Sequence, residues 1–129
     1  MAKLLITDDS ATARMIIQRC IEVLGWDKCE FLHAADGVAA LEIVMKQQVD
    51  LIITDIVMPV MDGRALLKRI KVSPKLNHIP VFVISSLANP AMEQEMMQFG
   101  VDRLIYKPVS PPKLLEALEA TLGKDFREK

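Results

Sequence analysis

The sequence lacks an excess of charge of either sign. Its 129 residues hold 16 Lys and Arg against 17 Asp and Glu, a formal net charge of −1, and no basic stretch is longer than two residues. Such a balance creates no field that would gather nucleic acid or an anionic membrane. We therefore expect no direct nucleic-acid partner and no membrane partner.

Metal-binding cysteine motifs and long apolar runs are also absent. Cys20 and Cys29 stand without a CxxC or Cys/His ligand spacing, which favours reduced core thiols. No apolar run approaches the ~20 residues that span a bilayer, and the N-terminus has no signal-peptide layout. We expect a cytoplasmic protein with a single domain over residues 1–129, comprising a core of about 3–122 and a short tail at 123–129.

Short apolar runs and amphipathic runs alternate five times along the chain. The apolar runs, which we expect to be strands, are Leu4–Ile6, Phe31–Leu32, Leu51–Ile53, Val81–Ile84 and Leu104–Tyr106. Three of them show no alternation, as is typical of strands covered on both faces, whereas the run at Phe31 is mixed and suits a sheet edge. Five successive β-α units predict a parallel sheet with right-handed crossovers, in a three-layer α/β/α sandwich.

Capping residues predict where the helices begin and end. Helices are expected after Ser10, Asp36, Asp62-Gly63, Asn89-Pro90 and Ser110-Pro111. Gly25 and Gly100 are expected to end the first and the fourth. The second helix is expected to carry the apolar residues Val38, Leu41 and Met45.

Polar residues follow four of the apolar runs. They are Thr7-Asp8-Asp9-Ser10, Thr54-Asp55, Ser85-Ser86 and Lys107-Pro108. Each alone has an ordinary explanation as a helix cap, a turn or loop polarity. Because parallel strands all point the same way, however, these positions converge on the sheet edge where open α/β folds bind their ligands. The convergence predicts one functional site.

Crowded acids at that edge need positive charge. Two unit charges 4 Å apart repel by ~1 kcal/mol in water and by ~4 kcal/mol at an effective dielectric of 20. Lys107 neutralises one of the three charges of Asp8, Asp9 and Asp55, and a divalent cation would neutralise the remainder. Oxygen donors without a nearby histidine or cysteine favour Mg²⁺ or Mn²⁺ over Zn²⁺. We expect the two histidines, His33 and His78, to be satisfied or exposed polar residues instead.

The ordered set LLITDDS, LIITDIVMPVMDG, VFVISS and LIYKP resembles the receiver domain of bacterial two-component response regulators. The match covers roughly residues 3–122 and is closest to single-domain, chemotaxis-type regulators. The resemblance implies a flavodoxin-like fold with five strands in the order 2-1-3-4-5 and five helices. It also implies a signalling switch that catalyses only its own phosphorylation and dephosphorylation, with Asp55 as the phosphoacceptor.

The resemblance also assigns roles at the site. Asp9, Asp55 and the backbone carbonyl of Val57 are implied as direct Mg²⁺ ligands, with Asp8 acting through water. The phosphoryl donor would be a sensor histidine kinase, a phosphotransfer protein or a small acyl phosphate. A carboxylate is a poor nucleophile toward an anionic phosphoryl group, so a cation and Lys107 are needed to reduce the repulsion.

Around the phosphoryl group, Ser85 is implied to donate a hydrogen bond and Lys107 to pair with another oxygen. Ser86, Val57 and Leu87 would flank it, and the two apolar side chains are expected to limit the approach of water and lengthen the phosphate's life. A cis peptide is implied before Pro108.

The switch departs from the family pattern. Leu104 stands where many relatives carry an aromatic residue, and Tyr106 lies one residue before the lysine. The signal is therefore expected to pass through Tyr106 from a different angle or through the loop after Ser85.

A downstream protein target is expected to bind the face formed by the fourth helix, fifth strand and fifth helix. The stripe Met92, Met96 and Phe99 is assigned to the core, which leaves Glu93, Met97 and the Tyr106 edge for contact. The protein would be a monomer or a weak, phosphorylation-linked dimer.

Alternatives remain. The chain could be a receiver from a larger regulator or hybrid kinase, or a docking module that is not phosphorylated. A phosphatase with an aspartyl nucleophile would need a second acid two residues on, where Val57 stands. A flavin or dinucleotide binder would need a Gly-rich loop after the first strand.

Overall fold

The computed structural model describes residues 2–86 and 89–123. Its elements are β1 (Lys3–Thr7), α1 (Ala11–Ile21), the π-helical turn η1 (Glu22–Trp26), β2 (Glu30–Ala34), α2 (Gly37–Lys46), β3 (Leu51–Thr54), α3 (Gly63–Val72), β4 (Val81–Ser85), α4 (Pro90–Gln98), β5 (Arg103–Tyr106) and α5 (Pro111–Leu122). All neighbouring strands are parallel, in the order β2-β1-β3-β4-β5. The predicted fold and strand order are confirmed.

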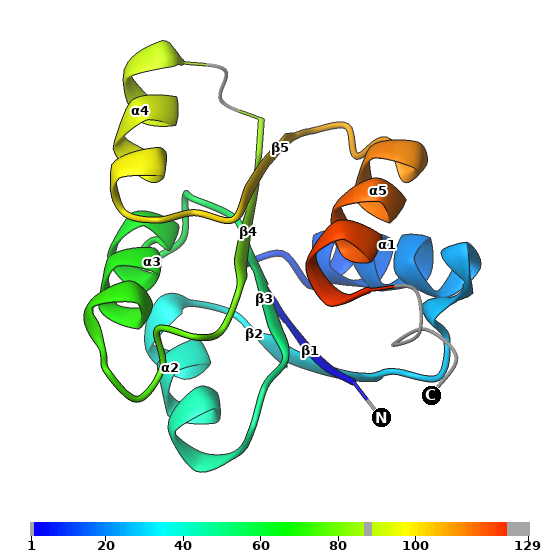
Figure 1. Ribbon diagram of the computed structural model, residues 1–129, viewed down its shortest axis with the longest axis horizontal. Helices are drawn as coiled ribbons and strands as arrows, with labels where there is room; N and C mark the ends of the chain where they lie inside the picture. Colours follow the sequence, from blue (N-terminus) through cyan, green and yellow to red (C-terminus); the bar gives the residue numbers. More distant parts are fainter. Residues whose placement is uncertain (1, 87–88, 124–129) are drawn as a thin grey trace.

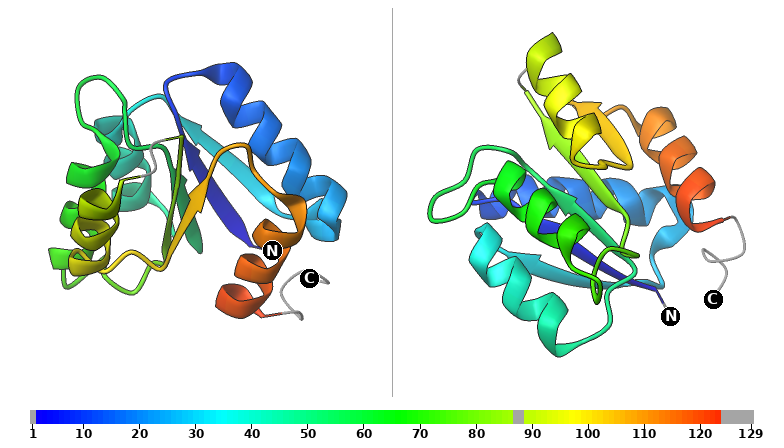
Figure 2. Two further views of the ribbon diagram at one scale, coloured as in Figure 1. Left: turned by 90° about the horizontal axis from the view of Figure 1, so that it is seen from above. Right: turned by 60° about the vertical axis from the view of Figure 1, so that its left-hand side comes forward.

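The sheet is covered on both faces (Figures 1 and 2). Helices α2, α3 and α4 pack on one side, and α1 and α5 pack on the other. Successive side chains of β3 show the alternation: Ile52 joins the core under α2–α4, whereas Ile53 joins the core under α1 and α5. Both are fully buried, which explains why this run is apolar without alternation.

The mixed strand lies at the sheet edge, as predicted. β2 pairs only with β1 among the described strands, and its residues from Glu30 to His33 are exposed or half-buried. An edge strand has one neighbour in the sheet, so it tolerates the polar side chains that a central strand cannot.

The predicted helix starts are confirmed. Ser10, Asp36, Asp62 and Asn89 each accept a hydrogen bond from a backbone N–H in the first turn of the helix that follows. Ser110 precedes α5 without such a side-chain bond, and Pro111 occupies the first helical position there.

The helical backbone is broken at Gly25, as predicted. Regular α1 ends at Ile21 and the π-helical turn η1 follows it, but Gly25 itself has φ 99° and is not helical. The fully buried Trp26 beyond it belongs to the core under α1 and α5.

One correction concerns α2. Leu41 is half-buried and packs against the core, as predicted, but Val38 and Met45 are exposed, at 37% and 53%. The buried residues are Gly37, Ala40 and Val44. Both sets have helical spacing. The smaller one faces the sheet because its short side chains let α2 lie close to β1 and α3.

The fold leaves the carboxyl ends of β1, β3, β4 and β5 at one edge of the sheet, which places their following residues together. Within residues 2–86 and 89–123, none of the helices has the length and apolar character to cross a bilayer.

Candidate functional site

Asp8, Asp55 and Lys107 meet at this edge. The Lys107 ammonium lies 3.2 Å from an Asp55 carboxylate oxygen and 3.4 Å from an Asp8 carboxylate oxygen. The side chains of Asp8, Asp55 and Lys107 are 3%, 17% and 29% exposed. The partly buried Lys107 ammonium thus pairs with two acids, which follow strands that are far apart in the sequence.

Backbone groups hold both carboxylates in place. The Ser10 N–H donates to Asp8 Oδ1 at 2.9 Å, and the Ile56 N–H donates to Asp55 Oδ1 at 2.7 Å. In each acid the other oxygen, Oδ2, faces Lys107. The two side chains are therefore fixed by one backbone donor and one shared cation.

The charge of Lys107 follows from its neighbours. Burial by itself lowers the pKa of the ammonium, but the Asp55 and Asp8 carboxylates outweigh it, and the pKa is raised above its ordinary value. Lys107 therefore stays protonated at neutral pH and offers a permanent positive charge to an anionic ligand.

The serines lie on the neighbouring strand end. Ser85 is buried and Ser86 is exposed. The Ser85 carbonyl accepts a hydrogen bond from the Lys107 N–H at 2.8 Å, which joins the ends of β4 and β5. The peptide bond between Lys107 and Pro108 is cis, as the resemblance implied. Leu87 lies outside the described residues.

The donors suit magnesium, although the described residues form no dense acidic cage. Asp9 is exposed, and in the part of the chain that the structure describes no three Asp, Glu, His or Cys side chains are close enough to hold a metal ion by themselves. Mg²⁺ commonly takes only one or two carboxylates and retains several waters. Asp8 and Asp55 supply such oxygens, and Asp9 and the carbonyl of the exposed Val57 stay predicted ligands.

Sequence reasoning missed two residues at the site, Gly63 and Arg14. A Cβ added to Gly63 would lie 2.1 Å from the Asp55 carbonyl oxygen, so only glycine fits where α3 begins beside Asp55. Arg14 donates to the Asp8 carbonyl oxygen. Neither contact leaves a pattern in the residue types of the sequence.

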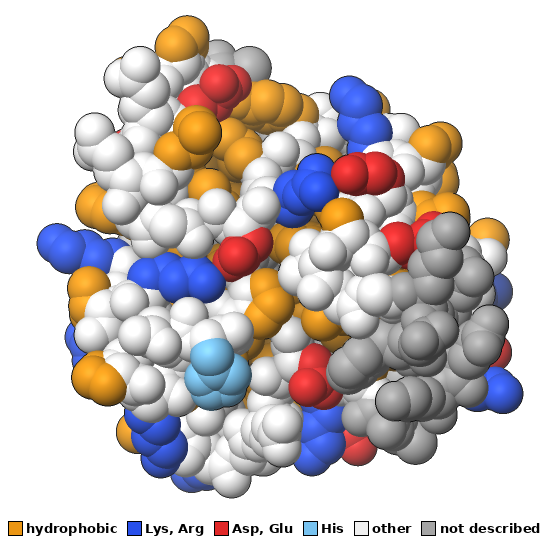
Figure 3. Space-filling view, viewed as in Figure 1, with side chains coloured by type: hydrophobic (Ala, Val, Ile, Leu, Met, Phe, Trp, Pro, Cys, Tyr) orange, Lys and Arg blue, Asp and Glu red, His pale blue; other side chains and the backbone are white. Residues whose placement is uncertain are grey.

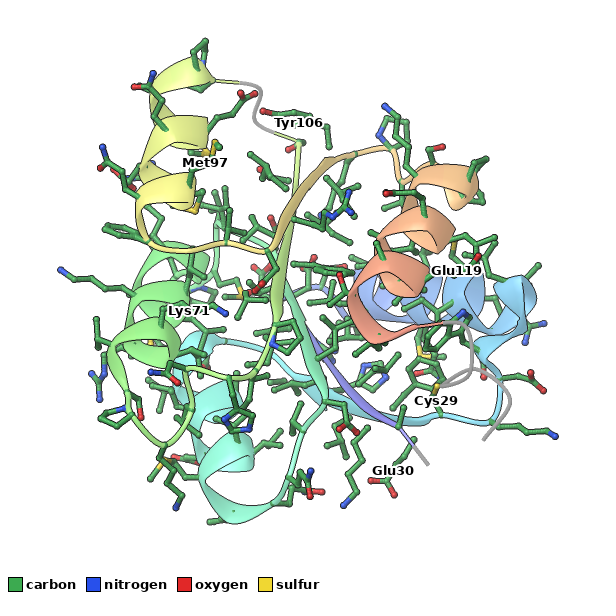
Figure 4. The ribbon with its side chains drawn as sticks, viewed as in Figure 1. Cys29, Glu30, Lys71, Met97, Tyr106 and Glu119 are labelled. Carbon is green, nitrogen blue, oxygen red and sulfur yellow. The ribbon has the colours of Figure 1, made fainter. Side chains whose placement is uncertain are left out.

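Tyr106 points toward α4 (Figure 4). Leu104 packs with the core under α2–α4, so Tyr106, two residues on along β5, lies on the same face of the sheet. Its hydroxyl donates to the Glu93 carboxylate in the first turn of α4. The tyrosine thus reaches α4 from the position on β5 nearest to the site.

A groove runs beside this contact. It holds about 310 Å³ between α4 and β5, and its lining includes Glu93, Met97, Leu104 and Tyr106. Met97 is 72% exposed, and hydrophobic side chains gather on this face over α4 and β5 (Figure 3). Met92 and Met96 are buried, as expected.

The two histidines behave as predicted. His33 hydrogen-bonds to Arg14 and Gln18, and His78 is exposed.

Known proteins resemble this chain in sequence and in fold. The sequence pattern of the response regulator receiver domain matches residues 4–119. The chemotaxis protein CheY homolog of Campylobacter jejuni is 36% identical over 122 residues, which cover 94% of this chain and 92% of that protein. The structure of Vibrio cholerae chemotaxis protein CheY4 matches with a TM-score of 0.82 and 30% identity, over 94% of this chain and 98% of the other.

A more distant match is the receiver domain of the Pseudomonas aeruginosa sensor histidine kinase PA1611, whose structure has a magnesium ion coordinated in its active site cleft. It has a TM-score of 0.82 at 22% identity, over 95% of this chain and 98% of the other, a likeness that shows the fold alone. With the family pattern over nearly the whole chain and close relatives among the chemotaxis regulators, the chain belongs to the response regulator receiver domain family.

Proposed function

We propose that this receiver domain accepts a phosphoryl group on Asp55 in a Mg²⁺-dependent reaction and thereby changes its binding to a protein target. The observation that carries the proposal is the pairing of Asp55 with Lys107 beside the buried Asp8. An acid at a strand end with a fixed cation on one side is suited to an anionic electrophile.

The chain's own residues account for the transfer. One Asp55 carboxylate oxygen forms a bond to phosphorus while the donor's P–N bond (phosphohistidine) or P–O bond (acyl phosphate) breaks, and the bonding electrons leave with the donor. Lys107 pairs with an oxygen of the transferring group, and Ser85 hydrogen-bonds another. Mg²⁺, held by Asp9, Asp55 and the Val57 carbonyl with Asp8 acting through water, would supply the positive charge that offsets the remaining repulsion.

The switch follows from contacts at the same strand ends. A phosphoryl oxygen that draws Ser85 inward moves the residues after β4, and these lead into α4. Because Tyr106 lies opposite Ser85 in the sheet register and also bonds Glu93, a movement of α4 must change or break the Tyr106–Glu93 contact. The face of α4, β5 and α5, with its groove, is the proposed binding surface for the target.

The donor in this proposal is a sensor histidine kinase, a phosphotransfer protein or a small acyl phosphate, and the setting is the cytoplasm. The domain acts as a phosphoacceptor and catalyses only its own phosphorylation and dephosphorylation.

The proposal is tested by intact mass. Wild type and Asp55→Asn are incubated with acetyl phosphate, each with and without Mg²⁺. Wild type is expected to gain one phosphoryl group only with Mg²⁺, and Asp55→Asn is expected to gain none. No gain by wild type from acetyl phosphate or from phosphohistidine donors would favour the docking module that is not phosphorylated.

A further inference from the structure

Arg14 holds the peptide unit that joins Asp8 to Asp9. Its Nη1 donates to the Asp8 carbonyl oxygen at 2.5 Å. The same guanidinium donates through Nε to His33 Nδ1 at 3.2 Å. A planar guanidinium engaged at two edges is fixed in direction, so it can fix the carbonyl in turn.

The fold brings these groups together from two elements. Arg14 and Gln18 are four residues apart on α1 and therefore share a helix face. His33 pairs in register with Ile6, whose side chain faces the core under α1, and so the imidazole lies beneath that helix face. The other ring nitrogen, Nε2, lies 2.6 Å from Gln18 Oε1.

The contacts assign the tautomer of His33. Nδ1 faces an Arg14 N–H and must accept, whereas Nε2 faces a carbonyl oxygen and must donate. The ring is therefore neutral with its proton on Nε2. Burial and the Arg14 charge both lower the pKa of His33, which is consistent with a neutral ring.

The held peptide controls the exposed acid. The Asp8 N–H donates to the Ala34 carbonyl at 3.1 Å, the Asp8 carboxylate is held by Ser10 and Lys107, and its carbonyl is held by Arg14. Asp9 is exposed. The held peptide plane before Asp9 therefore limits the directions that the Asp9 side chain can take.

We propose that Arg14, braced by the neutral His33 ring, is a positioning residue that aims the Asp8–Asp9 pair at Mg²⁺. The inference rests on the proposed function. It goes beyond that function by assigning a role to a contact between α1 and β2 that involves no phosphoryl or metal ligand side chain.

The arrangement also implies a response to pH. Protonation of His33 at Nδ1 removes the acceptor for the Arg14 Nε–H and places two positive charges side by side. The hydrogen bond that holds the Arg14 guanidinium is then lost. The charged residues on and next to the elements around the ring are Arg14 and Arg19 on α1, Lys3 on β1, Asp8 and Asp9 after β1, Glu30 on β2 and Asp36 after β2. His33→Gln keeps an acceptor oxygen for Arg14 that does not titrate.

The experiment measures Mg²⁺ binding to the unphosphorylated protein by titration calorimetry, with thermal melts to check folding. Arg14→Ala is expected to weaken Mg²⁺ binding about tenfold, as is usual when a partner that orients ligands is removed. Arg14→Lys keeps the charge but not the planar fork, and is expected to weaken it nearly as much. Arg19→Ala removes an exposed arginine of the same helix and is the matched control, expected to bind like wild type.

Two further comparisons distinguish a positioning role of Arg14 from an effect of its charge and from a general loss of protein stability. If Arg14 acted mainly as a repelling cation, Arg14→Ala would tighten Mg²⁺ binding, and this result would overturn the proposal. Between pH 7.5 and 5.5 the affinity of wild type should fall more steeply than that of His33→Gln, and equal slopes would also contradict it. If Arg14→Ala does not melt cooperatively, Arg14→Lys carries the comparison.

Failure of the inference is distinguishable from failure of the proposed function. Wild type that gains a phosphoryl group from acetyl phosphate, together with Arg14 variants that match it in Mg²⁺ affinity, would overturn the inference alone. Wild type that binds no Mg²⁺ would overturn both.

Discussion

The hydroxyl of Tyr106 donates a hydrogen bond to the carboxylate of Glu93, and this contact joins the last residue of β5 to the first turn of α4. Tyr106 also lies directly opposite Ser85 in the sheet. Tyr106 is therefore paired in the sheet with the proposed phosphoryl-sensing strand end, and its side chain bonds the helix of the proposed output face.

Removing that hydroxyl should loosen α4. Tyr106→Phe keeps the ring but leaves Glu93 without this donor, and the free energy of unfolding should fall by about 1 kcal/mol. Amide hydrogen exchange in α4 should be faster than in wild type, and phosphorylation should change it less, because the contact to be altered is already gone.

Glu93→Gln changes the other residue of this contact, but its amide oxygen can still accept a hydrogen bond from Tyr106. Its unfolding free energy and its amide exchange in α4 should therefore be closer to those of wild type than those of Tyr106→Phe are. Equal exchange in α4 for wild type and Tyr106→Phe, before and after phosphorylation, would remove Tyr106 from the switch.

Gly63 should be intolerant of any side chain. In Gly63→Ala the new Cβ would lie 2.1 Å from the Asp55 carbonyl oxygen, so the loop between β3 and α3 must shift. We expect a loss of about 1–3 kcal/mol in unfolding free energy and slower phosphorylation by acetyl phosphate. Urea denaturation and intact mass against time measure the two effects.

Gly100→Ala is the control for that substitution. Gly100 has φ 87°, so alanine there is also strained, by about 1–2 kcal/mol, but its nearest neighbour atoms belong to Lys71, away from the site. It should lose stability and keep the phosphorylation rate of wild type. A similar slowing in both variants would mean that stability alone governs the rate.

Val57 should lengthen the life of the phosphorylated state. Val57 is 65% exposed and lies two residues after the proposed phosphoacceptor, where an apolar group cannot orient an attacking water. Val57→Asn offers an amide that can, and the half-life of the phosphoryl group should become several-fold shorter. Val60→Asn, at an 81% exposed position of the same loop, should leave the half-life unchanged. A longer half-life in Val57→Asn than in wild type would contradict this role.

His33 should make the protein less stable in mild acid. Its pKa in the folded state is lowered from 6.5, so the fold favours the neutral ring. This contribution to stability is fully present above pH 6.5 and is lost as the pH falls through the lower folded-state pKa. Chemical denaturation at several pH values should show a smaller loss in His33→Gln than in wild type. His78→Gln, at an exposed histidine, should follow wild type, and parallel curves for all three proteins would show that His33 does not contribute.

The meeting of Asp8, Asp55, Ser85 and Lys107 could be predicted from the sequence. Each follows an apolar run, and parallel strands carry their carboxyl ends to one edge whatever the exact helix geometry. Strand alternation also places Leu104 and Tyr106 on one face, which would have favoured Tyr106 as the residue that reaches α4.

The contacts of Gly63, Arg14 and α2 could not be predicted in this way. The contacts of Gly63 and Arg14 depend on where the backbone oxygens of Asp55 and Asp8 lie after folding. Every residue has such an oxygen, so the residue types do not indicate its position. On α2 two apolar stripes have the same spacing, and only the close approach of the sheet decides that Ala40 and Val44 face inward.

The most direct test of the central claim is to locate the phosphoryl group. Wild type is phosphorylated with acetyl phosphate and Mg²⁺, reduced with sodium borohydride and digested, because borohydride converts an aspartyl phosphate to homoserine. We expect homoserine at position 55 in wild type, and unmodified peptides from a sample prepared without Mg²⁺. Homoserine at Asp8 or Asp9, or no reduction product under any donor, would contradict it.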